Sequence, residues 1–225
     1  TLTGADTVEA YEAALRSIRF NNTSDNPDAT TRTIQWNVTD VSADASTALS
    51  LASAGTSSVT ITAVNDAPVL TGGGNTIQFS EGDAAVVLDN AIALSDLEGS
   101  AVTTVTVQLA GDGVAITDSE VLEFDATAST KVTGTLSNNN RTLTVTNTNN
   151  AANSDFQALL RTVKYANTDT ATLDGNRTIT FSAVETVGTD NFTSANIVTT
   201  VSVAALNDDA PVSYTHLRAH ETDRH

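Results

Sequence analysis

An alternation of apolar and polar residues dominates this sequence, above all between residues 75 and 206. Segments in which Val, Ile, Leu, Phe or Ala alternate with Thr, Ser or Gln are typical of strands with one buried face. We expect such strands at residues 75–80, 85–89, 102–110, 120–125, 131–136, 141–147, 177–184 and 196–206. Breaks rich in Gly, Asn and Asp separate these segments and predict turns. Many short strands joined by turns predict an all-β fold, in the form of a β-sandwich.

A helical period interrupts the alternation. Phe156, Leu160 and Val163 are spaced at i, i+4 and i+7, which places them on one face of a helix. Ser154 and Gln157 have the spacing of a capping box at its start. We therefore predict a short helix that closes one end of the sandwich and turns its aromatic residue into the core.

The pattern of helix and strands occurs twice. Residues 11–40, YEAALRSIRFNNTSDNPDATTRTIQWNVTD, match residues 156–185, FQALLRTVKYANTDTATLDGNRTITFSAVE, at a shift of 145 positions. Farther on, SVTITAVND at 58–66 matches TVSVAALND at 200–208, at a shift of 142. The residues that take the helix roles in the earlier copy are Asp6 and Glu9 for the cap and Tyr11, Leu15 and Ile18 for the apolar face. The repeating unit is about 140 residues, which is long for one domain.

The repeat sets the expected domain boundaries. We expect residues 1–66 to be the C-terminal part of a truncated repeat, residues 67–209 to be a complete repeat, and residues 210–211 to start a third. Residues 212–225 break the composition, because they hold all three histidines of the chain. They begin with VSYTHLRAHET, which resembles a translated sequencing adapter. We therefore treat residues 212–225 as a non-native tail and leave them out of the fold.

The charge of the chain narrows its expected partners. The 225 residues carry a formal net charge of −17. Such a surface repels nucleic acid and anionic membranes and attracts cations. No apolar run reaches the length of a membrane-spanning helix, so we expect neither nucleic-acid binding nor membrane insertion. The absence of cysteine fits either a reducing compartment or an exported protein that has no disulfides.

Composition also argues against catalysis. Without the tail, the chain has no His and no Cys, which excludes Ser-His-Asp, Cys-His and His-ligated metal arrangements. Two carboxylates could still act as a glycosidase pair. A sugar-cleaving site normally has stacking aromatic residues, whereas the single tryptophan, Trp36, falls at a core-facing strand position. We expect no enzymatic activity.

Four stretches carry a family resemblance: the junction VNDAPVL at 64–70, the opening EGD at 81–83, the turn SDLEG at 95–99, and the repeated block that contains RTI and NT. Together they resemble tandem cadherin-like repeats of large bacterial surface and secreted adhesin-type proteins, over residues 1–211. The resemblance implies cadherin-like, Ig-like Greek-key β-sandwiches with one short helix per repeat. It also implies an extracellular location, at the bacterial cell surface or secreted, and Ca²⁺ at the junctions between repeats.

The residues near the junctions suit that cation, since calcium takes six to eight oxygens from carboxylates, amides and backbone carbonyls. The candidate ligands for the first junction are Asn65, Asp66, Glu81, Asp83, Asp96 and Glu98, with Asp40 from the preceding copy and its equivalent Glu185 in the next. The second junction offers Asn207, Asp208 and Asp209. Two departures weaken the match to the family: Ala63 and Ala205 stand where the linker has an acid, and Glu98 replaces an aspartate.

Simpler interpretations of these acidic stretches stay open. The sequence NDAP is also a turn signal, because Asn and Asp bond to their own backbone and Pro blocks strand extension. A second acidic stretch, residues 22–28, is predicted to be a loop with Asx turns rather than an ion site.

The resemblance implies a non-enzymatic function, that of a calcium-rigidified spacer in a long extracellular bacterial adhesin-type protein. Its partners would be the neighbouring repeats of the same chain, with a cell-surface glycan or protein bound through other domains. The alternative is that the domain itself binds carbohydrate or protein through loops at one end. Aromatic residues exposed together on one face would favour that alternative.

Overall fold

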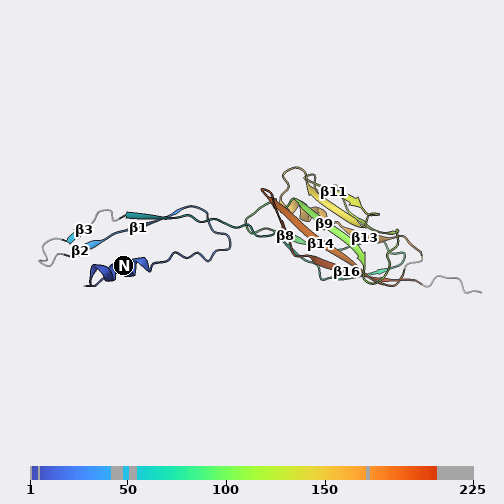
Figure 1. The fold of residues 1–225 in the computed structure, drawn as a ribbon. Helices are drawn as coiled ribbons and strands as arrows, with labels where there is room; N and C mark the ends of the chain where they lie inside the picture. The colour runs from blue at the N-terminus through green and yellow to red at the C-terminus, as the bar shows by residue number, and fades with distance from the viewer. Residues whose placement is uncertain (1, 5, 42–47, 51–54, 171–172, 207–225) are drawn as a thin grey trace, which may run out of the picture. The chain divides into compact units, whose positions relative to one another are not determined.

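The computed structural model describes residues 2–4, 6–41, 48–50, 55–170 and 173–206. They fall into two compact units, which divide between Asn65 and Asp66 (Figure 1). The start of a third repeat at 210–211 and the tail at 212–225 lie outside the described residues. In the part of the chain that is described, no helix is long and apolar enough to cross a membrane.

The described residues of the first unit form a short helix and four strands. Its elements are α1 (Val8–Arg16), β1 (Arg32–Trp36), β2 (Thr39–Val41), β3 (Ala48–Ser50) and β4 (Gly55–Val59). Strand β1 pairs antiparallel with β4, and β2 pairs antiparallel with β3. None of the residues of α1 is buried.

The cap of α1 lies one residue later than predicted. Thr7 is the N-cap, and its hydroxyl oxygen accepts a hydrogen bond from the Ala10 N–H at 3.3 Å. Asp6 accepts instead from the Thr7 N–H at 2.8 Å, and Glu9 is an acidic residue in the first turn. The prediction that Asp6 and Glu9 form the cap was therefore wrong, because Thr7, which is also a favoured N-cap residue type, supplies the capping oxygen.

The second unit is built on a sheet of seven strands. Six of them follow one another in the order β11 (Val132–Ser137), β12 (Thr142–Asn147), β9 (Thr104–Gly111), β14 (Gly175–Val187), β16 (Ile197–Ala204) and β6 (Thr76–Ser80), and β15 (Asp190–Thr193) pairs with β14. The pairing of β16 with β6 is parallel, and the other pairings in this sheet are antiparallel. Three consecutive asparagines, Asn138–Asn140, adopt the left-handed conformation in the turn between β11 and β12, which asparagine tolerates better than most residues.

The smaller elements complete this unit. A second sheet has the order β10 (Glu120–Glu123), β13 (Lys164–Asn167) and β7 (Val86–Val87), and β5 (Val69–Thr71) pairs with β8 (Ala93–Ser95). All eight predicted strands are present. The strands that the sequence did not predict, β5, β8, β13 and β15, have only three or four residues each. An alternation needs more positions than that to be recognised.

The two sheets share one hydrophobic core. Large residues of the seven-stranded sheet, such as Phe79 and Phe181, pack in the same cluster as Leu122 and Tyr165 of the smaller sheet. The rings of Phe79 and Tyr165 meet edge to face with their centroids 5.0 Å apart. The described chain is thus mostly β-sheet with two short helices, in the manner of an all-β sandwich.

The helix of the second unit, α2 (Asn153–Leu160), packs against β8 and β11. The predicted burial of Phe156, Leu160 and Val163 is confirmed, but the helix ends at Leu160, so Val163 is buried just beyond it. The predicted capping box of Ser154 and Gln157 is wrong.

The start of α2 is fixed by other residues. The Asp155 carboxylate accepts a hydrogen bond from the Ala152 N–H at 2.9 Å. Asn153 bonds outward through both side-chain atoms, accepting from the Val102 N–H and donating to the Ser100 carbonyl. The N-cap is therefore Ala152, two residues before the predicted cap, and the start of the helix is tied to the loop that precedes β9.

The repeat is visible in the strand register. Arg177 lies opposite Val201 in the β14–β16 pair, and Arg32 lies opposite Val59 in the β1–β4 pair. These positions differ by 145 and 142, which are the two shifts that align the sequences. The first unit is therefore the structural counterpart of α2, β14 and β16.

Candidate metal-binding residues

One end of the second unit places the backbone of Asp66 against the turn that carries Asp96 and Glu98. The Asp66 N–H donates to Glu98 Oε2 at 3.2 Å, and the Ser100 N–H donates to Asp96 Oδ1 at 2.7 Å. We call this the leading end, because the chain enters the unit here. The backbone just after the NDAP junction is thus held by a carboxylate of the SDLEG turn.

Each of these two carboxylates has a second oxygen that is not satisfied. Asp96 Oδ2 and Glu98 Oε1 are buried and have no hydrogen-bond partner among the described residues. A buried oxygen without a partner is unfavourable by roughly 1–3 kcal/mol, and by more when it carries charge. Such atoms call for a bound water or ion as the explanation.

Glu185 lies at the same end. Its carboxylate is fully buried on the interior side of β14, two residues beyond Ala183. Its neighbour Val184 accepts hydrogen bonds from the Thr103 N–H and hydroxyl, both at 2.9 Å. Thr103 follows the loop that carries Asp96 and Glu98, so this loop and the end of β14 are adjacent.

Glu81 occupies the other end of the unit, where the chain leaves it; we call this the trailing end. Glu81 is 7% exposed, and its N–H donates to the Ala204 carbonyl at 2.9 Å. Its Oε2 accepts from the Leu206 N–H at 2.9 Å, and its Oε1 is buried with no partner in the described part of the chain. Asp83 is nearby and exposed, and it accepts from the Ser80 N–H at 2.7 Å.

The structure therefore corrects the expected grouping of the first-junction ligands. Gly175 pairs with Val203 at the trailing end, and Glu185 lies ten residues farther along the same strand at the leading end. At about 3.3 Å per residue, the two ends are about 33 Å apart. Glu81 and Asp83 cannot join Asp66, Asp96 and Glu98 around one ion.

The remaining predicted ligands are placed as follows. Asp40 pairs with Leu49 on strand β2 of the first unit, and Asn65 is the last residue of that unit. Asn207, Asp208 and Asp209 lie outside the described residues. The sequence also missed one acidic residue at the trailing end. Asp174 accepts a hydrogen bond from the Ala205 N–H at 2.6 Å. The sequence contains no sign of this role, because Asp174 lies in a predicted turn and its aligned residue in the first copy is Ala29, which is not acidic.

The donor chemistry at both ends fits calcium in part. Within the described residues, no three side chains of His, Cys, Asp or Glu gather closely enough to hold a metal ion. The buried atoms without a hydrogen-bond partner at the two ends are nevertheless carboxylate oxygens, those of Glu81, Asp96 and Glu98. A hard cation such as calcium prefers oxygen ligands of this kind. Each end supplies part of a coordination shell that would need further oxygens from the backbone, amides or water.

A separate buried network lies between the sheets. Arg177 and Glu120 are both fully buried, and the guanidinium forms a fork with the carboxylate, with Nε–Oε2 at 2.5 Å and Nη2–Oε1 at 3.1 Å. The Tyr165 hydroxyl donates to the same Oε2 at 2.7 Å. Burial raises the pKa of the Tyr165 phenol far above its usual value, and Glu120 raises it further. Burial alone lowers the pKa of Arg177, but the hydrogen bond and charge of Glu120 outweigh it, and the net pKa is raised.

The acidic stretch at residues 22–28 forms the predicted Asx turns. Asn22 Oδ1 accepts from the Ser24 N–H at 2.9 Å, and Asp28 Oδ1 accepts from the Thr30 N–H at 2.8 Å. The hydrogen bonds from the Thr30 hydroxyl and backbone lower the pKa of the Asp28 carboxyl. These oxygens are occupied by local backbone groups, as the turn interpretation requires.

A scan against protein-family models found no match, and a search of curated proteins found none either.

Proposed function

We propose that this chain is a non-enzymatic spacer segment of a long extracellular bacterial adhesin-type protein, built from cadherin-like Greek-key sandwiches that calcium holds rigid at their junctions. The VNDAPVL, EGD and SDLEG motifs support the family, and the all-β core supports the architecture. The calcium role rests on one observation, which concerns the two ends of the second unit.

At each end, a glutamate uses one oxygen to hold a junction N–H and keeps its other oxygen buried without a partner. Glu98 holds the Asp66 N–H where the chain enters, and Glu81 holds the Leu206 N–H where it leaves. A carboxylate that bonds the backbone through one oxygen and has no hydrogen bond at the other can give that second oxygen to calcium.

The repeat brings these two glutamates to the same junction. At the shift of 142, Leu206 corresponds to Val64 and Asp208 corresponds to Asp66. A junction between two complete repeats would therefore be held at N–H groups two residues apart. The repeat before it would supply a glutamate like Glu81, and the repeat after it would supply one like Glu98. Their unsatisfied oxygens would face a common seam.

The mechanical consequence follows from charge. The chain carries a net charge of −17, so carboxylates that converge at a junction repel one another. A calcium ion bound there would supply positive charge to offset this repulsion. Glu81 and Glu98 hold the junction backbone. Together with Asp96 they would present carboxylate oxygens to the cation. With the cation the junction is stiff, and without it the junction bends, which would make the spacing of a distal domain depend on calcium.

The test is thermal melting of the whole chain with calcium and with a chelator, and far-ultraviolet circular dichroism monitors the unfolding. The melting midpoint of the second unit is expected to rise with free calcium concentration, as mass action requires. Glu98→Gln and Glu81→Gln keep an oxygen that can accept the junction N–H and remove only the charge, so each should reduce the calcium-dependent rise. Glu123→Gln, at an exposed glutamate of β10, is the matched control and should leave it unchanged.

Superimposable melting curves in calcium and in chelator would remove calcium from the function and leave a passive spacer. A rise that survives both glutamate substitutions would place the ion elsewhere in the chain.

A further inference from the structure

The second unit has a hollow of about 360 Å³ beside the end of α2. Part of its lining is one row across the smaller sheet, in which Lys164 of β13 lies between Val87 of β7 and Glu123 of β10. The rest of the lining comes from the residues that follow β10 and from the end of α2. The volume is within the range of sites that hold small molecules.

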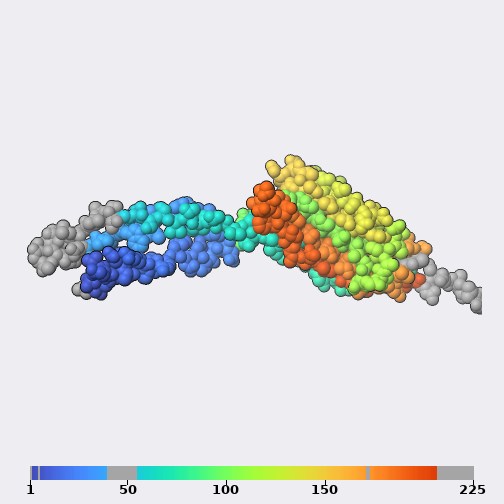
Figure 2. Space-filling model, viewed as in Figure 1, coloured from blue at the N-terminus to red at the C-terminus, as the bar shows by residue number. Residues whose placement is uncertain are grey.

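The walls of this hollow rest on the hydrophobic core. Leu122, Val163 and Tyr165 are fully buried and alternate along the chain with residues that line the hollow. The segment after β10 is tied to the end of α2, because the Asp125 N–H donates to Thr162 Oγ1 at 3.0 Å. Figure 2 shows the residues after 66 as a closely packed body. The hollow is therefore formed before any ligand binds.

Two cations line the hollow without an ion pair. Three basic residues in the described part of the second unit form ion pairs, namely Lys131, Arg141 and Arg177. The other two there, Arg161 and Lys164, form none, and both line the hollow. We call them the basic pair. Acidic residues outnumber basic ones 27 to 10 in the chain, so unpaired carboxylates are unavoidable whereas unpaired cations are not.

The basic pair has donors left for a ligand. Arg161 Nε donates to the Ile92 carbonyl at 3.0 Å, which holds the guanidinium at the hollow. Arg161 Nη1 and Lys164 Nζ make no hydrogen bond to the residues that the structure describes. The earlier copy of the repeat also has a cation at both positions, Arg16 and Arg19. A pair of cations at this place is thus a feature of the repeat.

Negative charge shares the same hollow. Asp125 Oδ1 accepts from the Thr127 hydroxyl at 2.6 Å and from its N–H at 2.8 Å. These bonds lower the pKa of Asp125, and the charge of Lys164 lowers it further, so this carboxylate is ionised at neutral pH. Glu123 adds a second carboxylate to the lining. A simple anion would be repelled by these carboxylates, and a simple cation would be repelled by the basic pair.

An apolar patch lies beside these charges. Val87 is 41% exposed, and Phe124 is half-buried. The Phe124 ring lies against Gly134, where a Cβ would come within 2.6 Å of ring atoms. Glycine at this position therefore lets the ring occupy its place at the hollow. The lining thus combines both signs of charge with an apolar surface.

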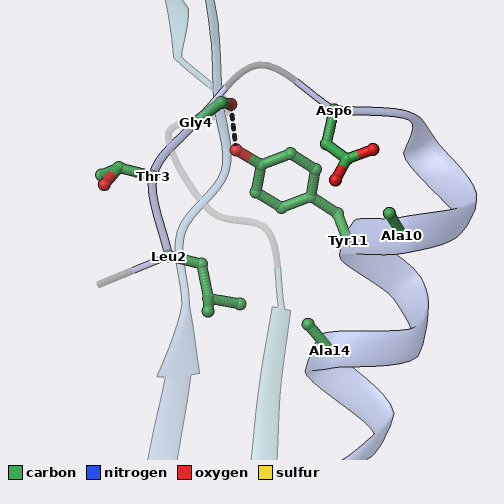
Figure 3. A pocket seen from close by; sticks show the side chains of 7 residues that line it. All are labelled: Leu2, Thr3, Gly4, Asp6, Ala10, Tyr11 and Ala14. Atoms are coloured by element: carbon green, nitrogen blue, oxygen red, sulfur yellow. Dashed lines mark hydrogen bonds between the residues drawn. The ribbon is translucent and has the colours of Figure 1, made fainter.

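A smaller hollow in the first unit lacks this combination (Figure 3). It has a volume of about 200 Å³ and lies between α1 and residues 2–4. Among the described residues that line it, Asp6 alone is charged. The Tyr11 hydroxyl donates to the Gly4 carbonyl across it. Volume alone does not make a binding site, and the chemistry of the lining distinguishes the hollow of the second unit.

We propose that the hollow of the second unit binds a free α-amino acid with an apolar side chain. The ligand carboxylate would lie between Arg161 and Lys164, since a guanidinium and a carboxylate form strong hydrogen bonds. The ligand ammonium group would face Asp125, and the side chain would pack on Phe124 and Val87. A ligand with both charges satisfies the basic pair and is not repelled by the neighbouring carboxylates. This activity is separate from the spacer function and does not depend on calcium.

The test is a titration of the whole chain with L-leucine in the presence of a chelator, monitored by amide NMR spectra. The amides of Phe124, Asp125 and Thr162 are expected to shift until the site is saturated. Two analogues each lack one charge: 4-methylpentanoate has no ammonium group, and 3-methylbutylamine has no carboxylate. Each should bind about tenfold more weakly or worse, because hydrogen bonds to a charged group are lost.

Substitutions locate the site. Arg161→Gln and Lys164→Gln should each weaken leucine binding by about tenfold or more, for the same reason. Lys131→Gln is the matched control, because it removes one positive charge outside the hollow and should leave the affinity unchanged. Lys164→Gln breaks no hydrogen bond of the described chain, so it keeps the test valid if Arg161→Gln disturbs the fold. The NMR spectrum of each variant shows whether it is folded.

Three outcomes would overturn the proposal. The first is the absence of saturable shifts at millimolar leucine, or saturable shifts at amides away from the hollow. The second is equal affinity for leucine and 4-methylpentanoate, which would make the hollow a site for simple anions. The third is leucine binding that Lys164→Gln leaves unchanged, or that Lys131→Gln weakens equally.

Discussion

The two units of this molecule have closely similar sequences over their shared part and different degrees of burial. Both form a helix followed by an antiparallel strand pair with the same register, Arg32 opposite Val59 and Arg177 opposite Val201. In the second unit these elements bury their apolar faces against β9 and the smaller sheet. In the first unit α1 buries none of its residues. The difference separates what the local pattern determines from what only a completed core provides.

Local pattern determines which elements form. The spacing of apolar residues on α1 and the alternation along β1 are intrinsic to the sequence and need no partner to be recognised. Stability has another origin, because ordering each residue loses about 1–2 kcal/mol of conformational entropy, and apolar burial must offset that loss. A helix of nine residues is also marginal on its own. The second unit should therefore carry nearly all of the folding stability of the described chain.

The sharpest test of this contrast is to replace the two aligned arginines, Arg177 and Arg32, one at a time. Arg177→Ala should lower the free energy of unfolding of the second unit by about 3–5 kcal/mol, because it leaves the Glu120 charge buried without its partner. Arg32→Ala, at the aligned position, should change the measured stability by less than about 0.5 kcal/mol. Urea unfolding followed by far-ultraviolet circular dichroism measures both variants under the same conditions.

Equal losses from the two substitutions would contradict the contrast, since they would require Arg32 to be buried and paired in the chain as it is. A small loss from Arg177→Ala alone would mean that water enters the space and solvates Glu120.

An apolar residue on the helix gives a second, somewhat smaller test. Leu160→Ala removes a side chain that is 1% exposed and should destabilise the second unit by about 2–5 kcal/mol through lost burial and a residual cavity. Leu15→Ala, at the aligned position with 37% exposure, should have little effect. The midpoint and slope of the urea transition distinguish lost stability from a change in the unfolded state. If Leu15→Ala proved as damaging as Leu160→Ala, the first unit would have a core of its own.

Much of the fold could be predicted because it depends on periodicity. All eight alternating segments became strands, Phe156 and Leu160 became buried positions of a helix, and Val163 is buried just after the helix ends. The helix caps could not be predicted as reliably. Several neighbouring residues can supply a capping oxygen, and the tertiary bonds of Asn153 to the loop before β9 decided where α2 begins. Strands of three or four residues leave too few positions for a pattern.

The candidate site was predicted in its residue types but not in its arrangement. Glu81 and Asp96 are fifteen residues apart in the sequence, which suggested one junction. Strand β6 carries the chain to the trailing end beside β16, whereas the turn with Asp96 returns it to the leading end. Only the sheet topology reveals this, because sequence distance does not record the direction of a strand. The Arg177–Glu120 pair was missed for the same reason, since its partners come from β14 and β10.

The smallest expected effect concerns the phenol in the buried network. Tyr165 donates to Glu120, and its aligned residue in the first unit is Phe20. Tyr165→Phe should lower the free energy of unfolding at neutral pH by about 1.5–3 kcal/mol, the range for a hydrogen bond to a charged group. Phe20→Tyr, the reverse change at the open position, should have almost no effect, because the added hydroxyl stays in water.

The pH dependence of the stability lost in Tyr165→Phe tests whether the loss comes from the buried phenol. Burial raises the pKa of Tyr165 in the folded chain, so above about pH 10, where a tyrosine in the unfolded chain ionises, the unfolded state binds fewer protons than the folded state. Stability that is complete below pH 10 is therefore lost as the pH rises toward the folded pKa. The Tyr165→Phe variant has no such loss. The difference between its free energy of unfolding and that of the unchanged chain should therefore shrink between pH 9 and pH 11, as measured by urea titration. A deficit that stays constant over this range would mean that the phenol is open to solvent, and the closed core that distinguishes the second unit from the first would then admit water at its centre.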